Sequence, residues 1–302
     1  MVSLLPGLTE LVCKLGLQDR LVGRSHECDF PKSVTDLPVL TSPGYPHTPD
    51  SESGEIHRSV TGLLQKALSI YDVDDDTLID LNPDIILTQD HCEVCAVTQD
   101  DLSSAVKQAL GQTTEVVSVS PTDLEGVCQS FIDVADTLGV RQRGEELAGS
   151  IQSRFDEIRS VTAQLPAPDV VAIEWIEPLM TGGNWMPEMI EIAGGVPHLA
   201  TAGKHSPWQL WEDVVACDPD VLLIVPCGFG ISKTKEEMTS ITEKESWQDL
   251  TSVRQNEVYL LDGNHYFNRP GPRIKESVEI LAEIFHPDVF KDRIDPNGWV
   301  RF

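Results

Sequence analysis

The chain carries one pattern of polar and aliphatic residues twice. Asp76-Thr-Leu-Ile-Asp-Leu-Asn-Pro-Asp-Ile-Ile-Leu is echoed further along by Glu212-Asp-Val-Val-Ala-Cys-Asp-Pro-Asp-Val-Leu-Leu. In each copy, an acidic residue begins a short amphipathic helix, a Pro-Asp pair ends it, and an aliphatic run follows that suits a buried parallel strand. The repeat predicts two α/β lobes and favours a functional site between them.

A long amphipathic segment separates the two copies. From about Arg141 to Gln164, apolar residues recur every three or four positions, which predicts one helix about 35 Å long at about 1.5 Å per residue. Pro166 and Pro168 end the pattern, and a new strand begins at Val170. The expected fold class is α/β, with two lobes joined by one long helix and a ligand cleft between them. The expected parts are an N-terminal α/β lobe at residues 1–140, a connecting helix at 141–165 and a C-terminal α/β lobe at 166–302.

Short aliphatic runs and turn residues predict the remaining elements. Strands are predicted at 20–24, 85–88, 116–119, 170–175, 221–225 and 257–261. Near the start of the chain, the segment around Pro6 predicts a turn and then a helix with Thr9 as its N-cap. Residues 41–60 are rich in Pro, Gly, Ser and Asp, and this composition predicts a loop that borders the site or the solvent.

Composition narrows the classes of partner. The formal net charge is −27, from 49 acidic and 22 basic residues, so a nucleic acid or an anionic membrane surface is excluded as a partner. No apolar stretch approaches the roughly 20 residues of a membrane span, and Met1-Val-Ser-Leu-Leu-Pro lacks the basic start of a secretory signal. The sequence as it stands therefore predicts a cytoplasmic protein, or a periplasmic or extracellular one if a leader was removed. An odd number of cysteines, 7, fits free thiols.

The candidate chemistry collects in loops that follow predicted strands. In open α/β sheets these loops face the crevice in which ligands bind. His, Cys and aromatic residues in four such loops are the first candidate site residues: His26, Cys28, His91, Cys92, Cys95, Cys227, Phe229, His265, Tyr266 and Phe267.

One of these loops carries a metal-binding type of spacing. His91, Cys92 and Cys95 can bring an imidazole and two thiolates to one metal ion, zinc or iron, with Zn–S bonds of about 2.3 Å. A structural zinc site would need a further ligand from another crevice loop. A redox dithiol and two buried thiols without a role are the alternatives.

Several segments together resemble a known family. The segments are Val2-Ser-Leu-Leu-Pro-Gly-Leu-Thr-Glu, Asp19-Arg-Leu-Val-Gly-Arg-Ser-His-Glu-Cys-Asp-Phe-Pro, both Pro-Asp strands, Gly194-Gly195 and Val258-Tyr-Leu-Leu-Asp-Gly-Asn. They are similar to the periplasmic-binding-protein-like receptors for cobalamin, siderophores and haem, the helical-backbone class of ABC-transporter substrate-binding proteins. The resemblance covers nearly the whole chain and is greatest to the cobalamin-binding branch.

The resemblance implies a corrinoid, cobalamin, as the ligand held between the lobes. A corrinoid is a large flat molecule with an apolar rim, amide arms and a metal centre, so its receptor needs aromatic walls and polar groups for the amides. Paired glycines before Asn184 allow close backbone approach, and its amide both donates and accepts. Further candidate ligand-binding residues are Pro6, Tyr45, Trp175, Asn184 and Trp185.

The resemblance also implies a partner. In transported members of this family, one acidic residue on each lobe docks against basic residues of an ABC permease, and by motif position these residues are Asp76 and Glu212. The alternative is that both carboxylates only stabilise the helix N-termini on which they lie. We expect a monomer that does not insert into a membrane.

Two other functional classes stay open at this stage. A bare-metal or haem carrier would use His and Cys from both lobes. A thiol-dependent or metal-dependent enzyme would use the motif from His91 to Cys95, although no nucleophile elbow, phosphate loop or HExxH motif accompanies it. The prediction is a binding protein rather than an enzyme. A single connecting helix resists wide hinge motion, so we expect the lobes to move little on ligand binding.

Overall fold

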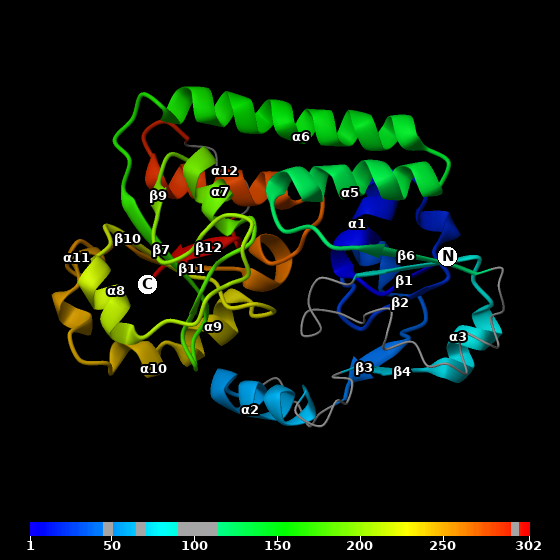
Figure 1. Cartoon of the computed structure of the whole chain (residues 1–302), viewed down its shortest axis with the longest axis horizontal. Helices are drawn as coiled ribbons and strands as arrows, with labels where there is room; N and C mark the ends of the chain where they lie inside the picture. The colour runs from blue at the N-terminus through cyan, green and yellow to red at the C-terminus, as the bar shows by residue number, and fades with distance from the viewer. Residues whose placement is uncertain (45–50, 65–70, 90–113, 291–295) are drawn as a thin grey trace.

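The computed structural model describes residues 1–44, 51–64, 71–89, 114–290 and 296–302. Two α/β lobes lie side by side, and the long helix α6 (Arg141–Thr162) runs along one edge of both (Figure 1). Helix α5 (Leu124–Thr137) packs against α6. Gly144 permits this close packing, because a Cβ there would lie 2.6 Å from the Cβ of Ala135. The predicted long helix is confirmed, while the boundaries of the lobes stay a prediction.

A parallel sheet forms the centre of the N-terminal lobe. Its strand order in the described part of the chain is β2-β1-β5-β6. The strands are β1 (Val2–Ser3), β2 (Gly23–Arg24), β5 (Ile85–Gln89) and β6 (Glu115–Val119). Among the described residues of this lobe, the helices besides α5 are α1 (Pro6–Lys14), α2 (Ser53–Leu64) and α3 (Asp75–Leu81), with 3₁₀ turns at Gln18–Arg20 and Lys32–Val34.

A mixed sheet forms the centre of the C-terminal lobe. Its order is β12-β11-β10-β7-β8, and β9 pairs with β7; β8 and β12 are antiparallel to their neighbours. The strands are β7 (Asp169–Trp175), β8 (Met180–Thr181), β9 (Val196–Pro197), β10 (Val221–Ile224), β11 (Val258–Leu261) and β12 (Trp299–Arg301). The helices are α7 (Met186–Ile192), α8 (Trp211–Cys217), α9 (Ile231–Glu237), α10 (Thr239–Thr242), α11 (Thr251–Arg254) and α12 (Ile274–Phe285), with a 3₁₀ turn at Trp247–Asp249 and a π-helical turn at Gly263–Phe267.

The sequence repeat is also a structural repeat. In each lobe, a short helix, α3 or α8, leads through a left-handed residue into a central parallel strand, β5 or β10. The left-handed residues are Asn82, with φ of 40°, and Asp218, with φ of 44°. Each directly precedes the Pro-Asp pair, which cannot continue the helix. Five of the six predicted strands are confirmed to within one residue at each end. The strand predicted at 20–24 is shorter, because a 3₁₀ turn includes Arg20 and only Gly23–Arg24 pair as β2.

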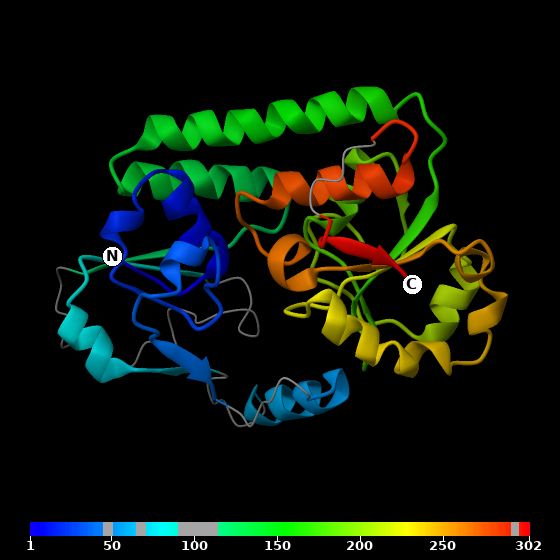
Figure 2. The ribbon, with the colours of Figure 1, turned by 180° about the vertical axis from the view of Figure 1, so that it is seen from behind.

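Residues 41–60 differ from the predicted loop. They contain β3 (Thr41–Pro43), which pairs with β4 (Tyr71–Val73) in a two-stranded antiparallel ribbon, and most of helix α2 (Ser53–Leu64). Both views place α2 on the side of the molecule opposite α6, below the gap between the lobes (Figures 1 and 2). The turn residues therefore delimit a helix instead of excluding one.

The two lobes share one core. A single buried cluster includes Leu8 of α1, Phe155 of α6 and Ile274 of α12. At the base of the cleft the backbones touch, because a Cβ on Gly7 would lie 2.6 Å from the carbonyl oxygen of Pro270. Helix α1 begins earlier than predicted, because Pro6 suits the first turn of a helix. Thr9 therefore lies inside the helix, and its hydroxyl donates to Ser3 Oγ at 2.8 Å.

Candidate functional site

A cavity of about 400 Å³ lies between the lobes. Loops that follow β1, β2, β10 and β11 contribute to it, as do the last residues of β5 and β7 and helix α2. This arrangement follows from the sheet geometry, since the carboxyl ends of parallel strands meet at one edge. Its lining includes Pro6, Glu27, His57, Tyr71, Glu174, Trp175, Asn184, Trp185, His205, Trp208, Cys227, Phe229, Phe267 and Arg269.

Aromatic rings form much of the wall. The ring of Trp175 lies 5.4 Å from that of Phe229, with 51° between their planes. Trp185 is buried, and its indole Nε1 donates to the carbonyl oxygen of Phe267 at 2.9 Å. Trp208 is 56% exposed at the edge of the cavity, where its ring makes an edge contact with His57 at 5.3 Å. Rings fixed in this way present flat apolar surface without further ordering.

Asn184 carries an unused acceptor in this wall. Its side-chain Oδ1 is buried and accepts no hydrogen bond from the described residues. Its backbone is fixed on both sides, since its N–H donates to Lys204 O at 2.6 Å and its carbonyl accepts from Gly203 N at 2.9 Å. The left-handed φ of 50° suits asparagine better than most residues. A buried acceptor without a partner is costly, so a ligand donor would stabilise it.

Two carboxylates line the cavity. Burial raises the pKa of Glu27 to about 7, although the Arg269 charge and a hydrogen bond from Tyr71 lower it. The Tyr71 hydroxyl donates to Glu27 Oε1 at 3.4 Å. The second, Glu174, accepts from Ser206 Oγ at 3.1 Å. The lining is therefore rich in acceptors and can carry negative charge.

The positively charged side chain in the lining is already paired with carboxylates of the protein. Arg269 is the single Lys or Arg among the described lining residues, and it is buried. Its guanidinium donates to Asp29 Oδ1 at 2.6 Å and lies 3.4 Å from Glu10 Oε1, both on the other lobe. Arg273 adds a second bond to Glu10, from Nε to Oε2 at 2.8 Å. These contacts tie the lobes together and leave little charge for an anionic ligand.

His265 extends the same ion-pair network. Its Nδ1 lies 2.7 Å from Asp262 Oδ2, and its Nε2 lies 3.5 Å from Asp29 Oδ2. Hydrogen bonds to Asp262 and then Asp29 raise the pKa of His265 to about 9. Burial opposes ionisation of Asp29, but the hydrogen bonds from His265 and Arg269 outweigh it and lower its pKa. His265 therefore joins the lobes as a cation and does not line the cavity.

Helix α2 is seated on the C-terminal lobe. The Ser53 backbone N–H and hydroxyl both donate to Glu237 Oε2, at 3.2 and 2.8 Å, and both residues are buried. Lys233 lies 3.1 Å from the same carboxylate. Further along α2, Ile56 and Phe229 belong to one apolar cluster that crosses the gap. The helix therefore covers the side of the cavity that is remote from α6.

The predicted ligand-binding residues divide into three groups. Those that line the cavity are Pro6, Trp175, Asn184, Trp185, Cys227, Phe229 and Phe267. Those that do not line it are His26, Cys28, His265 and Tyr266. Those that lie outside the described residues are Tyr45, His91, Cys92 and Cys95. Contact of the first group with a ligand stays a prediction.

Local bonds explain the second group. Nδ1 of His26 lies 2.7 Å from Thr41 Oγ1, so the imidazole is tied to the β3 ribbon. Cys28 is fully buried, and burial raises the pKa of its thiol to about 12. The Tyr266 ring lies under the guanidinium of Arg273, 5.2 Å from its centroid. Within the described ranges, no group of three His, Cys, Asp or Glu residues is arranged to hold a metal ion.

Sequence reasoning missed several lining residues. His57 lies on α2, which was predicted as loop, and Tyr71 begins a strand after that helix. Glu174 is the penultimate residue of β7, and His205 follows no strand directly. Glu27 lies between His26 and Cys28 in one of the selected loops, but it was not itself selected as a ligand-binding residue. For Glu174, its place at a strand end was the signal available.

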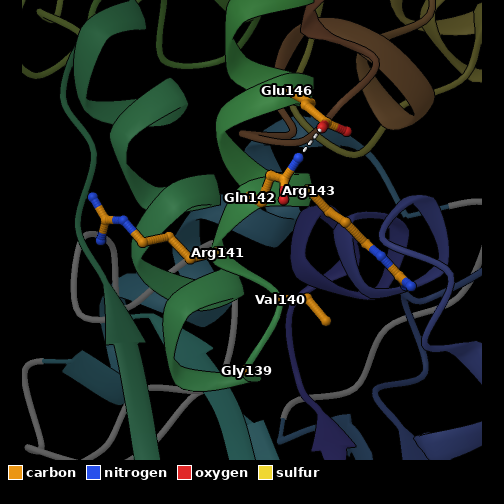
Figure 3. Close-up of a pocket in the computed structure, with 6 residues that line it drawn as sticks. All are labelled: Gly139, Val140, Arg141, Gln142, Arg143 and Glu146. Carbon is orange, nitrogen blue, oxygen red and sulfur yellow. Dashed lines mark hydrogen bonds between the residues drawn. The ribbon is translucent and has the colours of Figure 1, made fainter.

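A second hollow lies at the turn between α5 and α6, far from the cleft (Figure 3). Its charged groups are engaged with the chain itself. Arg143 donates to Leu15 O at 2.7 Å, Arg141 pairs with Glu145 at 2.8 Å, and Gln142 donates to Glu146 at 2.8 Å. These bonds stabilise the C-terminal end of α1 and the first turns of α6, so the charged residues of this hollow have a structural role.

Comparison with known proteins gives the family. The model of the periplasmic binding protein family matches residues 1–265. The chain belongs to the periplasmic binding protein family. The uncharacterized ABC transporter substrate-binding lipoprotein YvrC of Bacillus subtilis is 24% identical over 308 residues, covering 96% of this chain and 81% of YvrC. The vitamin B12-binding protein of Vibrio parahaemolyticus is 21% identical over 287 residues, covering 94% of this chain and 88% of that protein.

Solved structures share the fold of this periplasmic binding protein. The apo heme-binding protein RhuT of Roseiflexus sp. RS-1 has a TM-score of 0.68 at 22% identity, covering 95% of this chain and 97% of RhuT. The vitamin B12-binding protein BtuF of Vibrio cholerae has a TM-score of 0.65 at 19% identity, covering 96% and 97%. The predicted two-lobed α/β fold is confirmed.

Family membership settles the broad function. This periplasmic binding protein is the substrate-binding protein of an ABC transporter, and it is a binding protein rather than an enzyme. Its partners are a small-molecule ligand and a permease. The predicted cytoplasmic location is wrong, because the relatives are a lipoprotein and periplasmic proteins, which function outside the cytoplasm. Within the described residues, no helix is both long and apolar enough to cross a bilayer.

Proposed function

We propose that this periplasmic binding protein binds a corrinoid, cobalamin, in the cavity between its lobes and delivers it to an ABC permease. The observation that carries the proposal is the chemistry of the lining. Aromatic planes at Trp175, Trp185 and Phe229 suit a flat macrocycle, and the unpaired Oδ1 of Asn184 suits a donor from an amide arm. The relatives named as vitamin B12-binding proteins support the same ligand class.

The charge of the lining favours a corrinoid over haem. Haem carries two carboxylate groups, which need cations or hydrogen-bond donors where they are buried. Here Glu27 and Glu174 line the cavity, and the guanidinium of Arg269 is held by Asp29 and Glu10. Burying further negative charge beside these groups is unfavourable. Neutral amide arms avoid this cost and offer N–H donors to the acceptors already present.

We propose that α2 moves when the ligand enters, because the cavity is small. A volume of about 400 Å³ is near the lower end of the range of small-molecule pockets, about 300 to 1,000 Å³. A corrinoid with its arms is larger than this space. The lobes share a core and an ion-pair network, so α2, which sits on a two-stranded ribbon, is the element that shifts on ligand entry. Lobe rotation stays small in this proposal.

We propose that the permease docks on one acidic residue from each copy of the structural repeat. Asp76 and Glu212 are both exposed in the first turns of α3 and α8. The two helices lie on the outer flanks of opposite lobes (Figure 1). Two separated carboxylates present matched contacts to basic residues of a two-fold permease.

Titration of the purified protein with hydroxocobalamin, cobinamide and haemin tests the ligand. We expect both corrinoids to quench tryptophan fluorescence and to remain with the protein through gel filtration, and haemin to bind at least about a hundredfold more weakly. Asn184→Ala should weaken corrinoid binding about tenfold, as expected for one lost hydrogen bond in a dry site. Tight binding of haemin with no retention of either corrinoid would replace the proposed ligand by haem.

A further inference from the structure

We propose that the Nε2 atom of His205 is an axial ligand to the cobalt of the bound corrinoid, an inference that rests on the proposed function. His205 lines the cavity from the C-terminal lobe, and its side chain is accessible. Neutral imidazole is a common ligand for transition metals, cobalt among them. The proposal therefore gives the site a residue that recognises the metal centre as well as the rim and the amides.

The hydrogen bond on the other ring nitrogen fixes the tautomer. Nδ1 of His205 lies 3.0 Å from the carbonyl oxygen of Ser206. A carbonyl oxygen only accepts, so Nδ1 must carry the proton and donate it. In the neutral ring, Nε2 then holds the lone pair, and no described residue donates a hydrogen bond to it. Metal-binding histidines are usually oriented by this kind of bond from the second ring nitrogen to a carbonyl or a carboxylate.

The loop that carries His205 is held in place by the loop that carries Asn184. Gly183 N donates to Ser206 Oγ at 3.0 Å, and this hydroxyl donates to Glu174 Oε2 at 3.1 Å. Asn184 N donates to Lys204 O on the other side of the histidine. A Cβ on Gly183 would lie 2.5 Å from Lys204 O, so only glycine lets the two loops approach this closely. The imidazole is thus positioned before a ligand arrives.

The other cavity histidine is less suited to this role. Nε2 of His57 lies 3.4 Å from Thr61 Oγ1, and its ring packs against Trp208. The Thr61 contact holds the ring along α2, which is expected to shift on ligand entry, and the Trp208 contact covers one edge of the ring. His205 belongs instead to the fixed lobe. The geometry therefore favours His205 over His57 as the metal ligand.

The proposed step is a simple ligand exchange. Hydroxocobalamin in neutral water carries an exchangeable oxygen ligand on cobalt. The cobalt–oxygen bond of its aquo form breaks, a water molecule leaves, and a bond forms between cobalt and Nε2 of His205. The oxidation state of cobalt does not change. Cyanocobalamin keeps its cyanide in this position, so it can enter the cavity without undergoing the exchange.

Visible absorption spectra of the protein with hydroxocobalamin test the assignment. We expect the corrinoid bands to shift on binding to the unaltered protein, because nitrogen replaces oxygen at cobalt. In His205→Ala, the ligand should still bind, at least about tenfold more weakly, without this shift, and added imidazole should restore it. His198→Ala is the matched control, since His198 is exposed, pairs with Asp169 and does not line the cavity. It should behave as the unaltered protein.

Three results would overturn the assignment. In the first, hydroxocobalamin binds with the spectrum it has in water, in which case the corrinoid function stands and the axial bond does not. In the second, the shift persists in His205→Ala and disappears in His57→Ala or Cys227→Ser, which would move the bond to that residue. In the third, no corrinoid binds at all, which removes the proposed function and this inference together.

Discussion

Asp29 in the N-terminal lobe lies 2.6 Å from the guanidinium of Arg269 in the C-terminal lobe. Arg269 is buried, and the same group also faces Glu10. Replacing Arg269 by Ala leaves the carboxylate of Glu10 without one of its cations in the protein interior. We expect Arg269→Ala to lower the free energy of unfolding by about 3–5 kcal/mol, as for other broken buried pairs. Urea unfolding followed by circular dichroism measures it.

The exposed pair of Arg141 and Glu145 provides the control for this experiment. Both side chains are about half exposed, and such pairs contribute little. Arg141→Ala should change the free energy of unfolding by less than about 0.5 kcal/mol. Equal effects of the two substitutions would mean that the lobes are not held by the Arg269 network.

Glu27 should make the protein less stable as the pH rises. Its pKa is raised from 4.5 to about 7 in the folded chain, so folding costs free energy once the unfolded carboxyl ionises. This cost grows between about pH 4.5 and 7 and is constant above that window. We expect Glu27→Gln to stabilise the protein by about 1–2 kcal/mol at pH 8 and by almost nothing at pH 4.5, after allowance for solvent access.

Thermal unfolding of both proteins across this range provides the measurement. Stability of the unaltered protein should fall relative to Glu27→Gln as the pH is raised. The comparison removes the contributions of Asp29 and His265, which both proteins share. A constant difference between the two proteins from pH 4.5 to 8 would show that Glu27 titrates normally.

The seat of α2 on Glu237 should control ligand exchange rates. Removal of the buried carboxylate in Glu237→Ala takes away the acceptor for both Ser53 donors. We expect ligand association and dissociation both to be about tenfold faster, since one charged hydrogen bond contributes about 1.5–3 kcal/mol. Stopped-flow fluorescence with hydroxocobalamin measures both rates.

Glu236→Ala is the matched control for α2, because Glu236 is the exposed neighbour of Glu237 on the same helix. Its exchange rates should equal those of the unaltered protein. Unchanged rates in Glu237→Ala, with the fold intact by circular dichroism, would place ligand entry elsewhere.

Charge reversal at the proposed docking residues should separate transport from binding. Asp76→Lys and Glu212→Lys each place a cation where the permease is expected to present its own, so ligand-stimulated ATP hydrolysis by permease vesicles should fall at least about tenfold. Corrinoid affinity should not change, since neither residue lines the cavity. Glu146→Lys, on the exposed face of α6, is the control and should leave the ATPase rate unaltered.

The main helices and strands could be predicted from the sequence, because apolar periodicity and helix-ending residues depend only on neighbouring positions in the chain. Asn82 and Asp218 each stand directly before a Pro-Asp pair, and both adopt the left-handed conformation that ends a helix. Helix α6 has a clear apolar stripe and no internal proline. Helix α2 was missed because turn residues surround and enter it, as at Gly54, and its apolar face is completed only by contact with the other lobe.

The candidate site was harder to predict because it depends on contacts between distant segments. Trp175 and Phe229 were identified from strand ends, and that rule also selected His26 and His265, which the fold ties to Thr41 and Asp262 instead. No sequence pattern marks His205. Its place in the cavity follows from the packing of two loops against each other, which only the tertiary structure shows.

The contact of Gly7 with Pro270 sets a lower limit on the width of the cleft. The two backbones already meet there, so the lobes cannot come closer at their base. Any closure around a ligand must be a rotation that pivots on this point, with the outer rims moving and the floor stationary. A larger residue in place of Gly7 would act as a wedge that holds the rims apart.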